Sequence, residues 1–196
     1  MYNNPFYILR SKIEQLVKLP EEEWQLLVPF LEFKSIKKGH FFAKEGKIGG
    51  EIGIIVQGTM RHFYTIDGQE KTTYFYFENA FVGPYISFIS GKPSLINIDA
   101  LIDTELIVFP YKIMLQLQQK NIIWERFGRL IAEWALIGTE ERMVELLTLN
   151  PEQRYIKLLE SNKNKITERI PQHLIANYLG ITPVSLSRIR NRYMKR

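Results

Sequence analysis

The chain has 196 residues, of which 45% are apolar and none is cysteine, and its formal net charge is +5. A chain of this size can bury a hydrophobic core, and we expect a globular, cytoplasmic protein with no membrane association, because no apolar run approaches the roughly 18–20 residues that cross a bilayer. The absence of cysteine excludes disulfides, thiolate zinc sites, cysteine-ligated iron-sulfur clusters and cysteine nucleophiles.

Residues 5–31 are predicted to form short helices. Apolar residues recur there at helical spacing, and Pro20 precedes three glutamates that suit a first helical turn. From about residue 33 the pattern changes to short β-rich runs separated by glycines. These runs are 52–56, 60–66, 72–77 and 96–108.

The turn between two of these runs is the clearest β signal. Asp67-Gly68 predicts a hairpin, because a type I′ turn needs positive φ at both central residues. Many short strands at this spacing predict an antiparallel β-roll or jelly roll over residues 1–120.

After Pro110 the periodicity becomes helical. We expect one helix from about Asn121 to Thr148, closed by Asn150-Pro151, and a further helix over about 152–160. Five apolar residues at steps of 4, 3, 4 and 3 share one face of the long helix: Ile123, Phe127, Leu130, Trp134 and Ile137. This stripe predicts a homodimer interface over 121–148, while a helix that packs on its own core is the alternative.

The C-terminal segment is basic. Residues 161–196 hold eight basic side chains and one acidic one, which is typical of a polyanion-binding end, although a solvated basic terminus would show the same charge. Within it, Gly180 ends one predicted helix, and Thr182 with Pro183 begins the next after a tight turn. Two helices across a glycine turn form the helix-turn-helix layout.

The second of these helices has two different faces. The apolar face consists of Leu186, Ile189 and Tyr193. The opposite, polar face consists of Val184, Ser187, Arg188 and Asn191. Such a strip can lie in a major groove, where Arg188 can pair with guanine and Val184 can contact a thymine methyl. The residues better suited to phosphates are Thr182, Ser185, Arg190 and Arg192. We therefore predict double-stranded DNA as a partner, with a solvated helical hairpin as the alternative.

Five segments carry a resemblance to a known family: GHFFAKEG at 39–46, IGIIVQGTM at 52–60, FVGPYISF at 81–88, FGRLIAEWALIGTEER at 127–142 and LGITPVSLSRIR at 179–190. On these segments nearly the whole chain resembles the Crp-Fnr transcription regulators, in particular their divergent Bacteroidetes-type branch. The resemblance implies an α+β fold with a cyclic-nucleotide-binding-like β-roll over 1–120, a dimerisation helix over 121–148 and a helix-turn-helix domain over 149–196. It implies a homodimeric DNA-binding regulator that is no enzyme, with RNA polymerase as a further candidate partner.

The resemblance is incomplete at the reading helix. The family's base-reading positions fall on Pro183, Val184 and Arg188, and only Arg188 keeps the expected chemistry, so the family's familiar half-site should not be assumed. The two-stranded wing that follows the reading helix in the family is expected to be absent. A ligand-sensing or protein-interaction module that has lost specific DNA binding is the alternative function.

The sensor domain departs further. Pro84 replaces the family's ribose-binding Glu, Ser94 lies near the position of the phosphate-binding Arg, and no arginine occurs between Arg61 and Arg126. We therefore expect that cAMP and cGMP do not bind in the usual way, and we predict no cofactor. The positions that would line an effector pocket are Gly83, Pro84, Tyr85 and Ser94. The aromatic residues crowded in this region could line such a pocket, but residues in this pattern more often form core. The three histidines are scattered and predict no metal or haem site.

Overall fold

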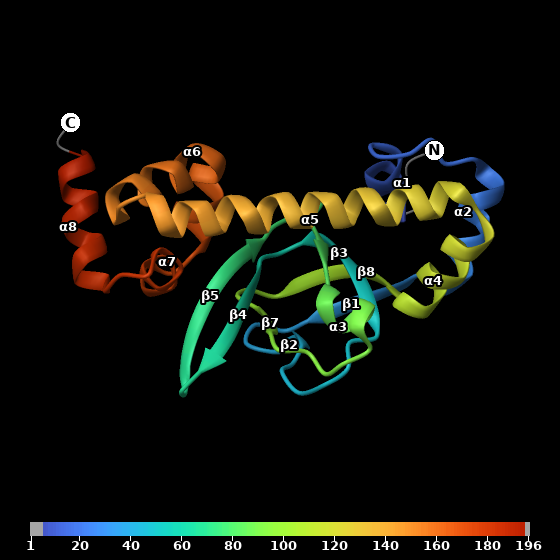
Figure 1. The fold of residues 1–196 in the computed structure, drawn as a ribbon, viewed down its shortest axis with the longest axis horizontal. Helices are drawn as coiled ribbons and strands as arrows, with labels where there is room; N and C mark the ends of the chain where they lie inside the picture. The colour runs from blue at the N-terminus through green and yellow to red at the C-terminus, as the bar shows by residue number, and fades with distance from the viewer. Residues whose placement is uncertain (1–5, 195–196) are drawn as a thin grey trace. The chain divides into compact units, whose positions relative to one another are not determined.

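Residues 6–194, without the side chains at 161–163 and 194, are described by a computed structural model (Figure 1). The chain divides into two units. The first runs to His62 and continues over Phe75–Ala135, and the second combines Phe63–Tyr74 with the chain from Leu136 onward. Within the described residues, no helix is both long and apolar enough to cross a bilayer.

The chain begins with the short helices expected over residues 5–31. They are α1 (Tyr7–Glu14), α2 (Glu21–Leu27) and the 3-10 helix η1 (Val28–Phe30). The apolar residues that set the helical period, including Ile13 and Trp24, are buried in one core with Trp124 and Phe127. That core joins the N-terminal helices to α4 (Tyr111–Lys120) and to the start of α5 (Ile122–Thr148).

Two four-stranded antiparallel sheets form the predicted β-roll. Their orders are β1-β8-β3-β6 and β2-β7-β4-β5. The strands are β1 (Glu32–Ile36), β2 (Phe41–Ala43), β3 (Glu51–Gln57), β4 (Met60–Ile66), β5 (Gln69–Tyr76), β6 (Phe81–Val82), β7 (Asn97–Ala100) and β8 (Thr104–Pro110). The hairpin between β4 and β5 is confirmed, since φ is 51° at Asp67 and 75° at Gly68. The single run expected over 96–108 is two strands, because the backbone bends at 101–103.

Alternation along the strands creates two cores. Successive side chains point to opposite faces, so Ile55 and Leu106 pack between the sheets while their neighbours Ile54 and Ile107 pack against the helices. All four side chains are fully buried. One short helix, α3 (Tyr85–Ser90), follows β6.

The C-terminal helices are α6 (Pro151–Arg169), α7 (Gln172–Leu179) and α8 (Pro183–Met194). Asn150 begins α6 with a capping box: its side chain accepts from the Gln153 backbone N–H at 3.0 Å, and the Gln153 side chain accepts from the Asn150 N–H at 2.9 Å. The helix extends beyond the expected end near residue 160, because no glycine or proline interrupts it before Pro171.

Candidate nucleic-acid interface

The turn between α7 and α8 has the local chemistry predicted for it. Gly180 adopts a left-handed φ of 70°, and its N–H donates to the Asn177 carbonyl at 3.0 Å, which ends α7. Thr182 caps α8, since its hydroxyl accepts from the Ser185 N–H at 3.2 Å. Helix α8 therefore begins at Pro183, three residues after Gly180.

The two faces of α8 also lie as predicted. Leu186 and Ile189 are buried, and Tyr193 packs edge-on against Tyr155 of α6 with ring centroids 6.2 Å apart. The opposite face is exposed and consists of Val184, Ser187, Arg188 and Asn191. This arrangement projects the polar strip away from its own unit, as a base-reading surface requires.

The residues assigned to phosphates have partners within the second unit. The Thr182 and Ser185 hydroxyl oxygens lie 3.0 Å apart, and Arg192 forms a 3.0 Å ion pair with Glu152 of α6. Arg190 lies near the Tyr155 hydroxyl; burial raises the pKa of Tyr155, and the positive charge of Arg190 partly opposes that rise. Arg190 and Arg192 thus attach α8 to α6, a role that the sequence did not predict.

The predicted pairing stripe of α5 is divided along its length. Phe127 is buried and packs edge-on against Phe81 with ring centroids 5.7 Å apart, so its assignment to a dimer interface is wrong. Ile123 and Leu130 are partly buried against the same core, because the first half of α5 covers its own unit.

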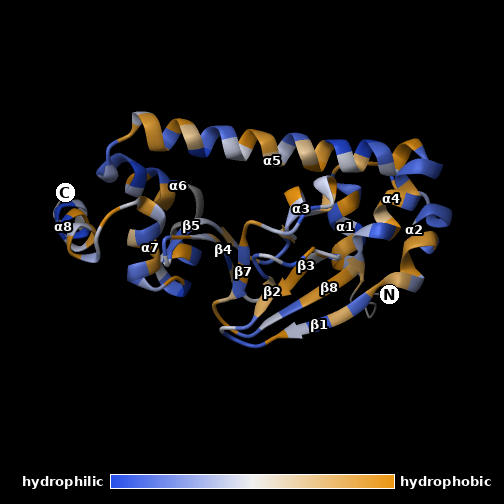
Figure 2. Cartoon of the chain, turned by 60° about the horizontal axis from the view of Figure 1, so that its bottom comes forward, coloured by the Kyte–Doolittle hydropathy of each residue, from blue (hydrophilic) through white to orange (hydrophobic). Residues whose placement is uncertain are grey.

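The second half of α5 exposes apolar residues instead. Trp134 and Ile137, from the predicted stripe, are each 58% exposed. The α5 apolar surface consists of Trp134, Leu136, Ile137, Met143, Val144 and Leu147, all exposed by more than a third. Figure 2 shows hydrophobic residues recurring to the end of this helix. Such a concentration of exposed apolar residues is typical of an interface.

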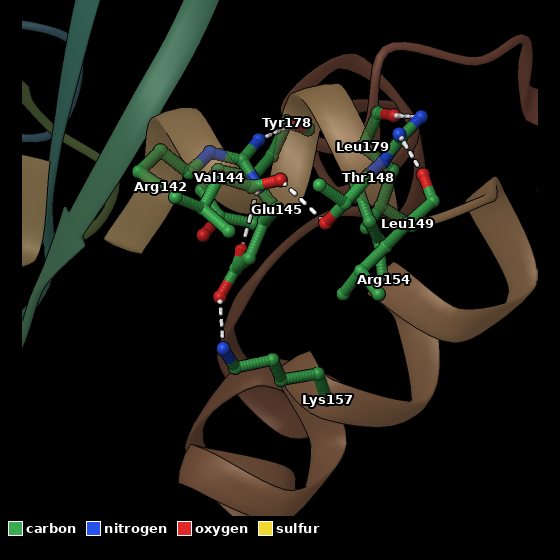
Figure 3. Close-up of polar contacts among 9 residues, drawn as sticks. All are labelled: Arg142, Val144, Glu145, Thr148, Leu149, Arg154, Lys157, Tyr178 and Leu179. Atoms are coloured by element: carbon green, nitrogen blue, oxygen red, sulfur yellow. Dashed lines mark hydrogen bonds and ion pairs between the residues drawn. The ribbon is translucent and has the colours of Figure 1, made fainter. Parts of the chain in front are cut away.

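Three polar residues of the second unit, Asn177, Arg142 and Arg154, hold α7 in place, and they were not identified from the sequence. Asn177 of α7 clasps the edge of β5: its side-chain oxygen accepts from the Thr72 N–H at 2.7 Å, and its side-chain nitrogen donates to the Glu70 carbonyl at 2.8 Å. The other two, Arg142 and Arg154, donate to carbonyls at the end of α7 (Figure 3). All three act across long sequence separations, which no local periodicity reveals.

Three of the residues proposed for an effector pocket, Gly83, Pro84 and Tyr85, are consecutive at the start of α3, and they pack against other parts of the protein. A Cβ added to Gly49 would lie 2.3 Å from Pro84, and one added to Gly83 would lie 2.7 Å from Phe88, so these backbones pack closely. Pro84 precedes α3, and burial raises the pKa of Tyr85, the first residue of that helix. The side chains of Pro84 and Phe88 therefore occupy the space next to Gly49 and Gly83.

Ser94 is buried and uses its hydroxyl locally. The hydroxyl donates to the Ile96 carbonyl at 2.9 Å and accepts from the Ile96 N–H at 3.1 Å. Its backbone N–H donates to the Lys47 carbonyl at 2.8 Å, which brings it to the same loop that Pro84 contacts. An effector pocket at these residues remains a prediction.

Comparison with known proteins gives matches over most of the chain. The family model described as Cyclic nucleotide-binding domain matches residues 33–121. The chain is 26% identical to the fumarate and nitrate reduction regulatory protein of Vibrio cholerae, with 97% of this chain and 76% of the relative covered.

Solved structures share the fold. FixK2 from Bradyrhizobium japonicum superposes with a TM-score of 0.76 at 17% identity, covering 84% of this chain and 85% of that one. A Crp/Fnr-family regulator from Eubacterium rectale gives a TM-score of 0.71 at 18% identity, covering 90% and 84%. The chain is therefore similar to Crp-Fnr regulators in two ways: residues 33–121 match the cyclic nucleotide-binding domain, and the fold matches those of the solved structures.

Proposed function

We propose that this chain is a Crp-Fnr-type transcription regulator that binds duplex DNA as a homodimer, with α8 of each subunit in a major groove. In this proposal residues 1–120 form the sensor domain, 121–148 the dimerisation helix and 149–196 the DNA-binding domain. The observation that carries it is the exposed strip of Val184, Ser187, Arg188 and Asn191 on a capped helix whose other face is buried.

Arg188 is the residue we assign to base recognition. Its guanidinium presents parallel donors that match the two acceptors of guanine in the major groove. Val184, 62% exposed one turn earlier, offers methyl groups to a neighbouring thymine. Arg192 and Thr182 flank the strip and would fix the register on phosphates, which for Arg192 means exchanging its contact with Glu152.

The test is selection of binding sites from random duplexes. Wild type should enrich a two-fold motif with half-sites about 34 Å apart. Arg188→Ala should lose the preference at one position of each half-site, at a cost of about 1–3 kcal/mol, while retaining non-specific binding. Arg126→Ala removes the same charge from an exposed position on α5 and should leave the motif unchanged. If wild type enriches no two-fold motif, the proposal is wrong.

We further propose that the β-roll does not use cAMP or cGMP. Pro84 offers no side-chain acceptor for a ribose hydroxyl, and the buried hydroxyl of Ser94 is bonded to its own backbone neighbour. Calorimetry with cAMP should therefore show no binding at micromolar concentrations. A micromolar dissociation constant would contradict this part of the proposal.

A further inference from the structure

The end of α7 lies directly before the turn of the helix-turn-helix. The last four carbonyls of a helix have no partner within the helix. In α7 the turn itself supplies donors to two of them, through the N–H groups of Gly180 and Ile181 at 3.0 Å each. The two carbonyls that remain belong to Tyr178 and Leu179, and they need donors from elsewhere in the chain.

Two arginines from other helices supply these donors (Figure 3). Arg142 of α5 donates to the Tyr178 carbonyl, and Arg154 of α6 donates to the Leu179 carbonyl at 3.0 Å. Arg154 also donates to the carbonyl of Leu149, just beyond α5, at 2.6 Å. Because α7 has no basic residue in its own last turn, these two guanidiniums complement the negative end of its dipole.

Arg142 is held in a defined position. Its guanidinium lies 3.8 Å from the centroid of the Tyr178 ring and forms a 3.2 Å ion pair with Glu145, which in turn pairs with Lys157 at 3.0 Å. A planar guanidinium can stack on a ring and donate sideways at the same time, which an ammonium group cannot do. This geometry links the second half of α5 to the end of α7.

The stability of the fold does not by itself account for these arginines. The Nε–H groups of Arg142 and Arg154 are buried and have no acceptor among the described residues. Burying a donor without a partner costs free energy, and apolar residues of similar volume often stabilise a protein as well as a buried ionic network does. Unlike apolar contacts, the charged hydrogen bonds of these arginines are directional, and they can therefore hold α7 in one defined orientation.

We propose that Arg142 and Arg154, together the arginine clamp, are positioning residues that fix the orientation of the helix-turn-helix relative to the second half of α5. This inference rests on the proposed function, because its consequence is for DNA recognition. In a dimer paired through α5, the clamp sets the separation and angle of the two reading helices, and therefore the half-site spacing that the protein accepts.

A distance measurement within one subunit tests the clamp without DNA. The natural chain contains no cysteine, so Thr139→Cys on α5 and Asn191→Cys on α8 give two exposed sites for spin labels. Labelled protein, diluted with unlabelled protein, should give one narrow distance distribution by double electron-electron resonance. Arg142→Gln and Arg154→Gln, each made in this background, should broaden that distribution.

Two controls keep this result interpretable. Arg129→Gln removes an exposed arginine of the same helix, which forms a local ion pair with Glu133 at 2.5 Å, and it should leave the distribution narrow. Arg142→Lys retains the charge but not the planar guanidinium that stacks on Tyr178, and its distance distribution should be intermediate in width. This variant takes the place of Arg142→Gln if Arg142→Gln does not fold. Distributions equal to wild type in the clamp variants would overturn the inference.

The consequence for recognition is measured with duplexes whose selected half-sites are moved one base pair apart or together. Wild type should lose about tenfold in affinity or more, the size of one lost base contact. Clamp variants should show a smaller loss while keeping the base preference of Arg188, and an undiminished loss would count against the clamp. If wild type selects no motif, the proposed function fails, and the distance measurement still decides on the clamp.

Discussion

Arg61 of β4 and Asp99 of β7 form a two-point ion pair that is buried in the first unit. The Arg61 Nε donates to one carboxylate oxygen at 3.1 Å and Nη2 donates to the other at 2.8 Å, and the two side chains are only 6% and 12% exposed. Nothing in the local sequence indicates this pair, because Arg61 and Asp99 are 38 positions apart, and each lies in a run of residues that predicts only a β-strand.

Removal of one partner should expose the cost of that burial. Asp99→Ala leaves the Arg61 charge buried without its carboxylate, and we expect it to lower the free energy of unfolding by about 3–5 kcal/mol. The double variant Arg61→Met with Asp99→Leu removes both charges and should recover most of the loss. Urea denaturation measures both, and a loss below about 1 kcal/mol in Asp99→Ala would contradict the prediction.

His62 should make the protein less stable in acid. Burial lowers the pKa of His62 from 6.5 to about 4, so between these values the unfolded chain binds more protons than the folded one. The free energy of unfolding should therefore fall as the pH decreases from about 6.5 to 4, by up to about 1.4 kcal/mol per pH unit from this group. Urea denaturation across that range should show a shallower pH dependence for His62→Phe than for wild type; equal slopes would contradict the assignment.

At the scale of the elements, local chemistry was enough to predict some of the boundaries, although the end of α6 was expected too early. The Thr182 cap, the Gly180 terminus and the Asp67-Gly68 turn each depend on one or two residues and their own backbone, so the sequence specifies them directly. The burial of Phe127 and the contact of Arg142 with the Tyr178 carbonyl depend instead on which distant segments pack together in the fold. Periodicity identifies an apolar face, but it cannot say whether that face covers its own core or a partner.

The contact between α7 and the β4–β5 hairpin is an example that only the folded chain reveals. Asn177 both accepts from and donates to the backbone of β5, and each hydrogen bond contributes about 1 kcal/mol net. Asn177→Ala should therefore raise the amide exchange rate of the Gln69–Tyr76 segment by about five- to thirty-fold, if exchange follows local opening. Hydrogen exchange with mass spectrometry measures this.

Two further variants make that measurement specific. Asn177→Asp keeps the acceptor for Thr72 but cannot donate to the Glu70 carbonyl, so its exchange rate should be intermediate. Asn164→Ala changes an exposed asparagine of α6 and should leave the segment unaffected. Exchange in Asn177→Ala at the wild-type rate would show that the hairpin is held by other contacts.

At the scale of the whole molecule, the exposed α5 apolar surface is the feature that a dimer would cover. One apolar face of the first half of α5 is already buried against its own unit, whereas Leu147 is 78% exposed and Leu136 is 67% exposed. Apolar surface of this extent is costly in water, and pairing with the same helix of a second copy buries it in a self-complementary way. The dimer that we propose thus rests on the second half of the helix rather than on the full stripe predicted from the sequence.

A charge placed on this surface should separate the subunits. Ile137→Glu introduces a carboxylate at a position that is 58% exposed in one chain, and we expect sedimentation to give a dimer for wild type and a monomer for the variant. Ile89→Glu makes the same change on α3 at 57% exposure and should remain dimeric. Two linked DNA-binding domains gain about 10²–10⁴-fold in avidity for a duplex with two half-sites. Ile137→Glu should therefore lose about 10²–10⁴-fold in affinity for that duplex, and far less for a duplex with a single half-site. A wild-type monomer, or a dimer that survives Ile137→Glu, would mean that α5 does not pair through this surface.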